Sequence, residues 1–463
     1  MSVTQLPEGP TYESPDLGQR LTPTPSPSTD EAPHAPHTPP VAPWGLAKRT
    51  GFRFLFSYFV LYLLPFPIGQ LPIPGNPSRF WGQLDQWLSL WTETHLFGLE
   101  KAVPIVPTGS GDTMAQWASQ VNWLLIALGA TVIWSLLDRR RAHYARLSQW
   151  LTVYVRFGLA MIMFGYGFAK IIPTQMPAPQ LERLVQPWGE FSPMGVLWSF
   201  MGYSTVYQIF TGFGEAIGSF FLLFRRTTTL GALVLCAVLA NVVLMNYAFD
   251  VPVKLFSTNL LLMAVFLAAP DAKRLLDVLV RNRGAEPRPM TPLFTSTRLR
   301  RVATAVTVAF VGFVIFNNVK VVLGYYTNSI GPNAPKSPVW GIWDVEGVTK
   351  NAVDQPLLIS DATLVKRIVF GGLSRATFRT MSDSVERYAL TIDSVKREIT
   401  LTGRFDPKNV RTMSYTKPDS LHLVLAGKVG NDSLVVRLRK LDERRFTLTS
   451  RGFNWIQELP YNR

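Results

Sequence analysis

A carboxylate, Glu215, stands inside the apolar stretch GFGEAIGSFFLLFRR, which runs from Gly212 to Arg226. A charged side chain near the middle of a bilayer costs about 2.5–3.5 kcal/mol on insertion scales, so it needs a partner or a purpose. At helical spacing, small and polar residues share one stripe with it: Gln208, Thr211, Gly212, Gly218 and Ser219. The stripe predicts that this side faces a neighbouring helix rather than lipid.

Arg156 is the predicted partner of Glu215. Arg156 lies about eight residues from Ser148 and Glu215 about nine from Phe224, which places both roughly 12–14 Å deep at the rise of a helix. Guanidinium binds carboxylate with two-point geometry. The pair would serve either as a structural clasp that fixes helix register, or as a ligand anchor or proton relay.

Four further charged residues, Lys170, Asp250, Lys254 and Asp112, fall near the opposite ends of the apolar segments. Together they predict a vestibule at the outer face of a membrane bundle, where a ligand would enter. Two simpler interpretations remain open: lysines that reach for the interface, and aspartates that cap helices.

The sequence shows no catalytic motif, so catalytic residues and any enzymatic activity stay unassigned. The run GFGEAIG follows no strand, which excludes a dinucleotide fingerprint, and neither a phosphate loop nor a nucleophile elbow occurs. With one cysteine and no HExxH pattern, we expect no metal site. No cofactor is evident, although a quinone is compatible with the apolar environment.

Composition indicates a membrane protein with a soluble appendage, because 47% of the 463 residues are hydrophobic and only 17% are charged. The net charge of +15 follows the order of the loops: Lys and Arg are dense in alternate connections and sparse in the others. This alternation is the positive-inside pattern, so we expect a cytoplasmic N-terminus and an extracytoplasmic C-terminal domain, with no nucleic-acid partner.

The chain divides into three predicted regions. Residues 1–46 are rich in Pro, Ser and Thr and predict a disordered tail. Residues 47–326 predict a helical membrane domain, and residues 335–463 an all-β domain. Seven apolar segments predict the spans: 52–68, 120–137, 148–172, 197–224, 228–249, 253–270 and 302–324. A tryptophan-rich segment at 79–98 predicts either an interfacial helix or a buried one.

The last 125 or so residues alternate with period two in short runs separated by turn residues, which predicts consecutive antiparallel strands. Eight runs qualify: 340–347, 364–371, 387–394, 397–403, 410–416, 421–427, 432–440 and 445–450. An up-and-down barrel removes exposed edges and is favoured over a β-sandwich. Trp343 on the first strand and Arg451 after the last are typical of the closure of lipocalin-type barrels. Whether the barrel is hollow stays open.

Residues about 148–280 resemble the DoxX-like family of bacterial membrane proteins. The resemblance lies in VRFGLAMIMFGYGFAKIIP, GFGEAIGSFFLLFRRTTTLGALVL and YAFDVPVKLFSTNLLLMAVFLAAPD, with Arg156, Lys170, Glu215 and Arg225 at matching positions. It implies a four-helix core in the bacterial inner membrane and a link to quinone-dependent oxidoreduction. The additional helices and the barrel depart from the short family pattern.

Three functions are therefore compatible with the sequence. The first is binding or handling of a quinone or lipid at the outer face of the membrane. The second is a subunit of a quinone-linked oxidoreductase, whose electrons would come from a redox partner protein. The third is an assembly or scaffold protein in which the charge pair is only structural.

Overall fold

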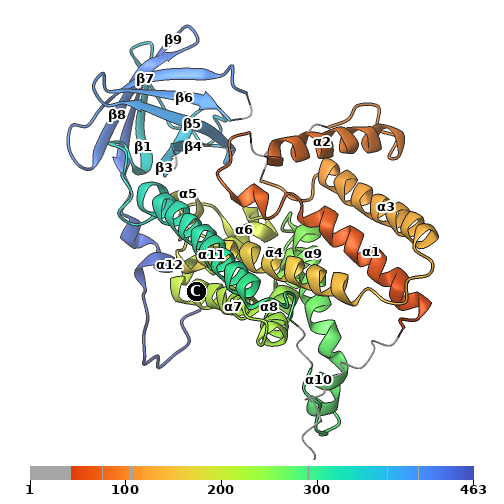
Figure 1. The fold of residues 1–463 in the computed structure, drawn as a ribbon. Helices are drawn as coiled ribbons and strands as arrows, with labels where there is room; N and C mark the ends of the chain where they lie inside the picture. Colours follow the sequence, from red (N-terminus) through yellow and green to blue (C-terminus); the bar gives the residue numbers. More distant parts are fainter. Residues whose placement is uncertain are drawn as a thin grey trace, which may run out of the picture. The chain divides into compact units, whose positions relative to one another are not determined.

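The computed structural model describes residues 43–75, 77–103, 109–288, 292–372, 374–404 and 406–462 (Figure 1). The predicted disordered tail at 1–46 lies outside these ranges except for its last four residues, so it stays a prediction. The first helix already begins at Leu46.

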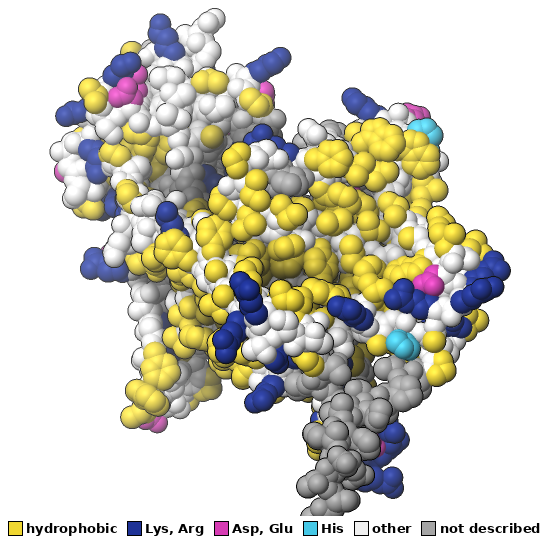
Figure 2. Space-filling model, viewed as in Figure 1, with side chains coloured by type: hydrophobic (Ala, Val, Ile, Leu, Met, Phe, Trp, Pro, Cys, Tyr) yellow, Lys and Arg dark blue, Asp and Glu magenta, His cyan; other side chains and the backbone are white. Residues whose placement is uncertain are grey.

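Seven helical segments of the described chain are long and apolar enough to cross a membrane, which makes this a multi-pass membrane protein. Their helices are α1 (Leu46–Leu63), α3 (Met114–Leu137), α4 (Ala145–Ile171), α7 (Thr205–Leu223), α8 (Thr228–Ala248), α9 (Lys254–Ala268) and α11 (Thr297–Tyr325). The tryptophan-rich segment forms α2 (Pro77–His95), and the shorter helices include α5 (Leu181–Leu184), α6 (Pro193–Tyr203) and α10 (Ala272–Leu279). Figure 2 shows hydrophobic side chains covering the helical region, as lipid contact requires.

The predicted span 197–224 is divided into two helices. Ser204 separates α6 from α7, and its hydroxyl accepts a hydrogen bond from the backbone N–H of Tyr207 at the start of α7. Serine competes for backbone hydrogen bonds in this way, and therefore favours a helix start over a helix interior. The consequence is that α7 begins at Thr205, eight residues later than predicted.

Helix α4 is the centre of the bundle, and α7 packs along it. Gly212 on α7 is in close contact with α4: a Cβ added there would lie 2.8 Å from the carbonyl oxygen of Gly167 and 2.9 Å from the backbone N of Ile171. Glycine at such a crossing lets two membrane helices approach closely. The predicted polar stripe is thereby directed inward, with Gln208, Glu215 and Ser219 all buried.

The C-terminal domain is a closed antiparallel barrel. Its strands are β1 (Gly341–Lys350), β2 (Val353–Gln355), β3 (Val365–Gly371), β4 (Arg375–Thr380), β5 (Val385–Asp393), β6 (Glu398–Gly403), β7 (Val410–Thr416), β8 (His422–Val429) and β9 (Asp432–Lys440). Strands β3 to β9 pair in chain order, and β9 returns to pair with β1, while β2 adds only a short hairpin to β1. The pairing of β1 with β9 excludes the β-sandwich.

The strand predictions omitted β4 and assigned the segment 445–450 wrongly. The segment 375–380 forms β4 although its alternation is short and interrupted by arginines. Residues 445–450 are not a strand, because the chain turns into the short helix α12 (Thr447–Ser450) after β9. Apolar side chains from the strands form one buried cluster in the barrel, with Trp343, Phe370 and Leu401 fully buried.

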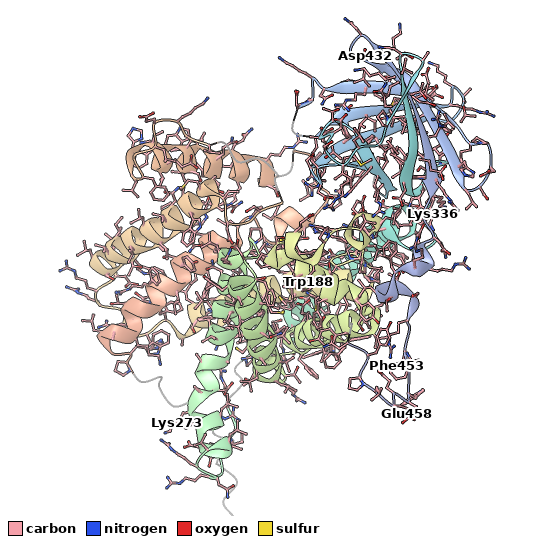
Figure 3. All side chains as sticks on the ribbon, turned by 180° about the vertical axis from the view of Figure 1, so that it is seen from behind. Trp188, Lys273, Lys336, Asp432, Phe453 and Glu458 are labelled. Carbon is pink, nitrogen blue, oxygen red and sulfur yellow. The ribbon has the colours of Figure 1, made fainter. Side chains whose placement is uncertain are left out.

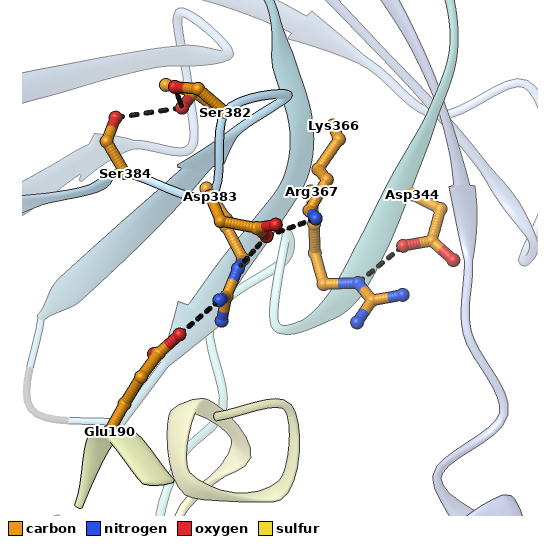
Figure 4. Close-up of polar contacts among 9 residues, drawn as sticks. Glu190, Asp344, Lys366, Arg367, Ser382, Asp383 and Ser384 are labelled. Carbon is orange, nitrogen blue, oxygen red and sulfur yellow. Dashed lines mark hydrogen bonds and ion pairs between the residues drawn. The ribbon is translucent and has the colours of Figure 1, made fainter. Parts of the chain in front are cut away.

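The loop after α4 packs on the outer surface of the barrel. Leu181 of α5 shares a small core with Ile342 and Val369. Arg379 of β4 donates hydrogen bonds to Glu190 (2.6 Å) and to Asp383 (2.8 Å) (Figure 4).

Lys336 lies in the connection from α11 to β1, whereas Lys273 lies on α10, away from the barrel (Figure 3).

Candidate ligand cavity

Glu215 is paired with Lys170. The Lys170 Nζ donates to Glu215 Oε1 at 2.6 Å, and the two side chains are only 7% and 3% exposed. Lys170 belongs to the last turn of α4, and Glu215 follows the Gly212 crossing by one turn. The glycine contact therefore fixes the separation of the two helices at which ammonium and carboxylate meet.

The predicted Arg156–Glu215 pair was wrong. The prediction counted depth from Ser148 on α4 and from Phe224 on α7, as if these two positions lay at the same level. In the structure α4 begins at Ala145 and α7 ends at Leu223. With Gly212 beside Gly167, the level of Arg156 is reached on α7 only at its last residue, Leu223, whereas Glu215 lies one turn from the crossing. Arg156 Nη1 instead contacts the Thr228 hydroxyl at 3.4 Å, in the first turn of α8.

The Lys170–Glu215 pair lines an apolar cavity of about 600 Å³. This volume falls in the range of small-molecule sites, about 300–1,000 Å³. The walls come from α4, α6, α7, α8 and α9, and are mostly apolar and aromatic: Met163, Tyr166, Met176, Leu197, Trp198, Met201, Phe210, Val238, Val242 and Leu260 are among them. A charged pair in such a wall can orient one ligand group.

Hydrogen-bonding capacity remains unused at this wall. Glu215 Oε2 and Gln175 Oε1 are both buried and have no hydrogen-bond partner among the described residues. The Lys170 ammonium has three donors, and the structure assigns one of them to Glu215. A buried polar atom without a partner costs free energy, so these atoms are available to bind a polar group that enters the cavity.

The cavity wall on α7 includes side chains that are exposed to the surroundings of the bundle. Phe210 is 71% exposed, and Tyr207, Phe213 and Ile217 are exposed as well. In a membrane these surfaces meet lipid tails, so an apolar molecule would enter from the bilayer.

The sequence did not reveal Gln175 or the buried Asn246–Ser257 hydrogen bond of 3.0 Å as part of this region.

Comparison with known proteins gives one informative match. The chain is 35% identical over 125 residues to "Uncharacterized protein YwoB" of Bacillus subtilis (strain 168), a match that spans 27% of this chain and 78% of that protein. The chain belongs to the YwoB family. Because YwoB is itself described only as uncharacterized, the family supplies no activity or ligand. No family model matches the chain, and no solved structure matches it.

Three of the four predicted vestibule residues meet in this YwoB-family chain. Asp112 accepts hydrogen bonds from the backbone N–H groups of Lys254 (2.8 Å) and Leu255 (3.0 Å), and thereby caps α9. Lys254 Nζ lies 2.8 Å from Asp250 and 3.7 Å from Asp112. The fourth residue, Lys170, is paired with Glu215 instead. The aspartates therefore have a capping and bridging role in the structure.

The barrel closure differs from the prediction at one of its two residues. Trp343 is fully buried, and its indole N–H donates to the carbonyl of Val339 at 2.8 Å. The cation beside its ring is Lys440, 6.0 Å from the ring centroid, because β9 ends there and pairs with Trp343. Arg451 lies beyond that strand and contacts Gln457 and Tyr461.

Across the described residues, no group of three or more His, Cys, Asp or Glu side chains is placed to hold a metal ion.

Proposed function

We propose that this YwoB-family protein binds one amphipathic hydrophobic molecule, a quinone or a lipid, in the Lys170–Glu215 cavity. The observation that carries the proposal is the buried ion pair in the wall of a mostly apolar cavity, with one carboxylate oxygen that has no hydrogen-bond partner in the described chain. A neutral group that both accepts and donates hydrogen bonds would complete this wall.

The two residues fit the chemistry of a quinone ring. A quinone carbonyl accepts a hydrogen bond, which a remaining N–H of Lys170 supplies. The hydroxyl of the reduced quinol donates one, which Glu215 Oε2 accepts. Neither partner needs to leave the ion pair, so the site binds a headgroup without exposing an uncompensated charge to the low-dielectric interior. A lipid hydroxyl would use the same two contacts.

The resemblance to DoxX-like proteins supports a place in the bacterial inner membrane and a link to quinone chemistry. With the N-terminus in the cytoplasm, as the distribution of basic residues favours, Lys170 lies at the outer end of α4. The cavity then serves the outer leaflet. A role as a subunit of a quinone-linked oxidoreductase would add a redox partner protein to this site, while leaving its residues unchanged.

Mass spectrometry of the small molecules retained in native-lipid nanodiscs tests the proposal. We expect one quinone or lipid species in stoichiometric amount in the wild type, lost from Glu215→Gln and kept in Glu100→Gln, a control at an exposed carboxylate. Identical bulk lipid in all three proteins would contradict it, and would favour a purely structural clasp in an assembly protein.

A further inference from the structure

A second cavity, of about 380 Å³, lies at the other end of α4, where the first turn of α8 and the segment after α9 meet it. Its charge is one-sided. Five arginines and one aspartate are among its lining residues: Arg156, Arg225, Arg226, Arg274, Arg288 and Asp271. A cavity with this surplus of guanidinium groups attracts anions.

Asp271 does not balance the remaining arginines, because its carboxylate is already in use. Arg274 donates to one of its oxygens at 2.6 Å, and Arg288 to the other at 3.1 Å. The Thr229 hydroxyl also donates to the second oxygen. Among the described residues, Arg156, Arg225 and Arg226 form no ion pair.

Arg156 is the residue that most requires a counter-charge. It is only 8% exposed, and its Nε is buried with no hydrogen-bond partner among the described residues. Within the described part of the chain, its side chain makes one hydrogen bond, to the Thr228 hydroxyl, which is long at 3.4 Å. A buried guanidinium without an anion is costly, and the neighbouring charge of Arg225 raises that cost.

Backbone groups add to the attraction. Helix α8 begins at Thr228, and both Thr228 and Thr229 line the cavity. The first N–H groups of a helix have no intrahelical acceptor and carry partial positive charge, so they bind phosphate readily. Together with a buried guanidinium, they form a site for a tetrahedral oxyanion.

We propose that this cavity binds a phosphate group, that of an anionic phospholipid, between Arg156, Arg225 and the first turn of α8. Apolar residues Val153, Leu267 and Leu293 complete the cavity wall, as acyl chains next to a headgroup would require. Basic pockets between membrane helices are known to suit such headgroups. The site is separate from the Lys170–Glu215 cavity and does not rest on the function proposed for it.

Binding of dioctanoyl phosphatidylglycerol to the delipidated full chain in a neutral detergent tests the proposal. Titrations with dioctanoyl phosphatidylcholine and with inorganic phosphate separate the anionic lipid from a zwitterionic one and from free phosphate. We expect phosphatidylglycerol to bind tightest, and Arg225→Gln to weaken it roughly fivefold, as removal of one guanidinium at a membrane surface does. Arg140→Gln, a control at an exposed arginine, should leave affinity unchanged.

Arg156→Gln should weaken phosphatidylglycerol binding more than Arg225→Gln does. If Arg156→Gln does not fold, Arg225→Gln alone tests the proposal. Equal affinity for phosphatidylglycerol and phosphatidylcholine would overturn the proposal, as would equal affinity in the wild type and Arg225→Gln. Inorganic phosphate that binds as tightly as phosphatidylglycerol would overturn the lipid as the source of the phosphate.

Discussion

Helix α4 carries two buried cations, and the structure treats them differently. Lys170, in its last turn, has a carboxylate partner at 2.6 Å and lines a cavity whose walls are mostly apolar. Arg156, eleven residues after its start, has no carboxylate partner among the described residues and lines a cavity rich in other arginines. Both side chains are less than a tenth exposed.

The difference indicates where each counter-charge comes from. At Lys170 the protein supplies the carboxylate, so a ligand that joins the pair is best neutral. At Arg156 the described residues supply none, so we propose that the anion comes from a ligand. One helix thus carries both proposed sites, one for a neutral amphipathic molecule and one for a phosphate group. The predictions below test the difference between them.

The largest effect is expected from breaking the protein's own pair. Lys170→Met or Glu215→Leu alone leaves one buried charge uncompensated and should cost about 3–5 kcal/mol in the free energy of unfolding. Unfolding in detergent micelles measures this. The double variant, which removes both charges, should recover much of the loss. A double variant as unstable as the single ones would show that the pair does not act as a unit.

Separating α4 from α7 should disturb the first site only. In Gly212→Ala, the new Cβ meets backbone atoms of Gly167 and Ile171 at 2.8–2.9 Å, so the helices must move apart. We expect the free energy of unfolding to fall by about 1–3 kcal/mol and the ligand of the Lys170–Glu215 cavity to be retained less well. The control is Gly129→Ala on α3, where a Cβ meets nothing within 4 Å, and where stability should rise slightly. Equal behaviour of both variants would contradict the close-contact role of Gly212.

Arg156 should behave in the opposite way to Lys170. In lipid-free detergent, Arg156→Met removes a buried charge that has no ion-pair partner among the described residues, so we expect the variant to be at least as stable as the wild type. Added phosphatidylglycerol should raise the melting temperature of the wild type more than that of the variant. A loss as large as that of Lys170→Met, without lipid, would mean that the protein itself balances Arg156.

The smallest effect concerns the loop that packs on the barrel. Burial raises the pKa of Glu182, so the folded state holds this proton more tightly than the unfolded chain. Its contribution to stability is therefore present at acidic pH and lost as the pH rises through the raised pKa. Glu182→Gln should stabilise the protein by less than about 1 kcal/mol at pH 7, and not at pH 4. Equal melting temperatures for Glu182→Gln and wild type at pH 7 would contradict this.

Several features of the fold followed from the sequence because they depend on local patterns. The seven spans were predicted from length and hydropathy, and the barrel from period-two alternation. The division at Ser204 was missed, because apolar residues continue on both sides of a single capping serine. Strand β4 was missed because it is held by pairing with β3 and β5 rather than by its own composition.

The site was predicted less completely than the fold. Glu215 was singled out correctly as a buried carboxylate, but its partner depends on the register of α7 against α4. That register is set by the contact between Gly212 and Gly167 at the crossing of the two helices. Counting depth along each helix separately gives no information about this tertiary contact. Lys170 was assigned to a vestibule for the same reason. Arg451 was misplaced because the last strand ends at Lys440.

Native mass spectrometry of wild type, Glu215→Gln and Arg156→Gln, released from the same nanodiscs, tests the central comparison most directly. We predict that the wild type retains one neutral amphipathic molecule and one anionic phospholipid. Glu215→Gln should lose only the neutral molecule, and Arg156→Gln only the phospholipid. Loss of both molecules from each variant, or of neither, would contradict two separate sites on α4.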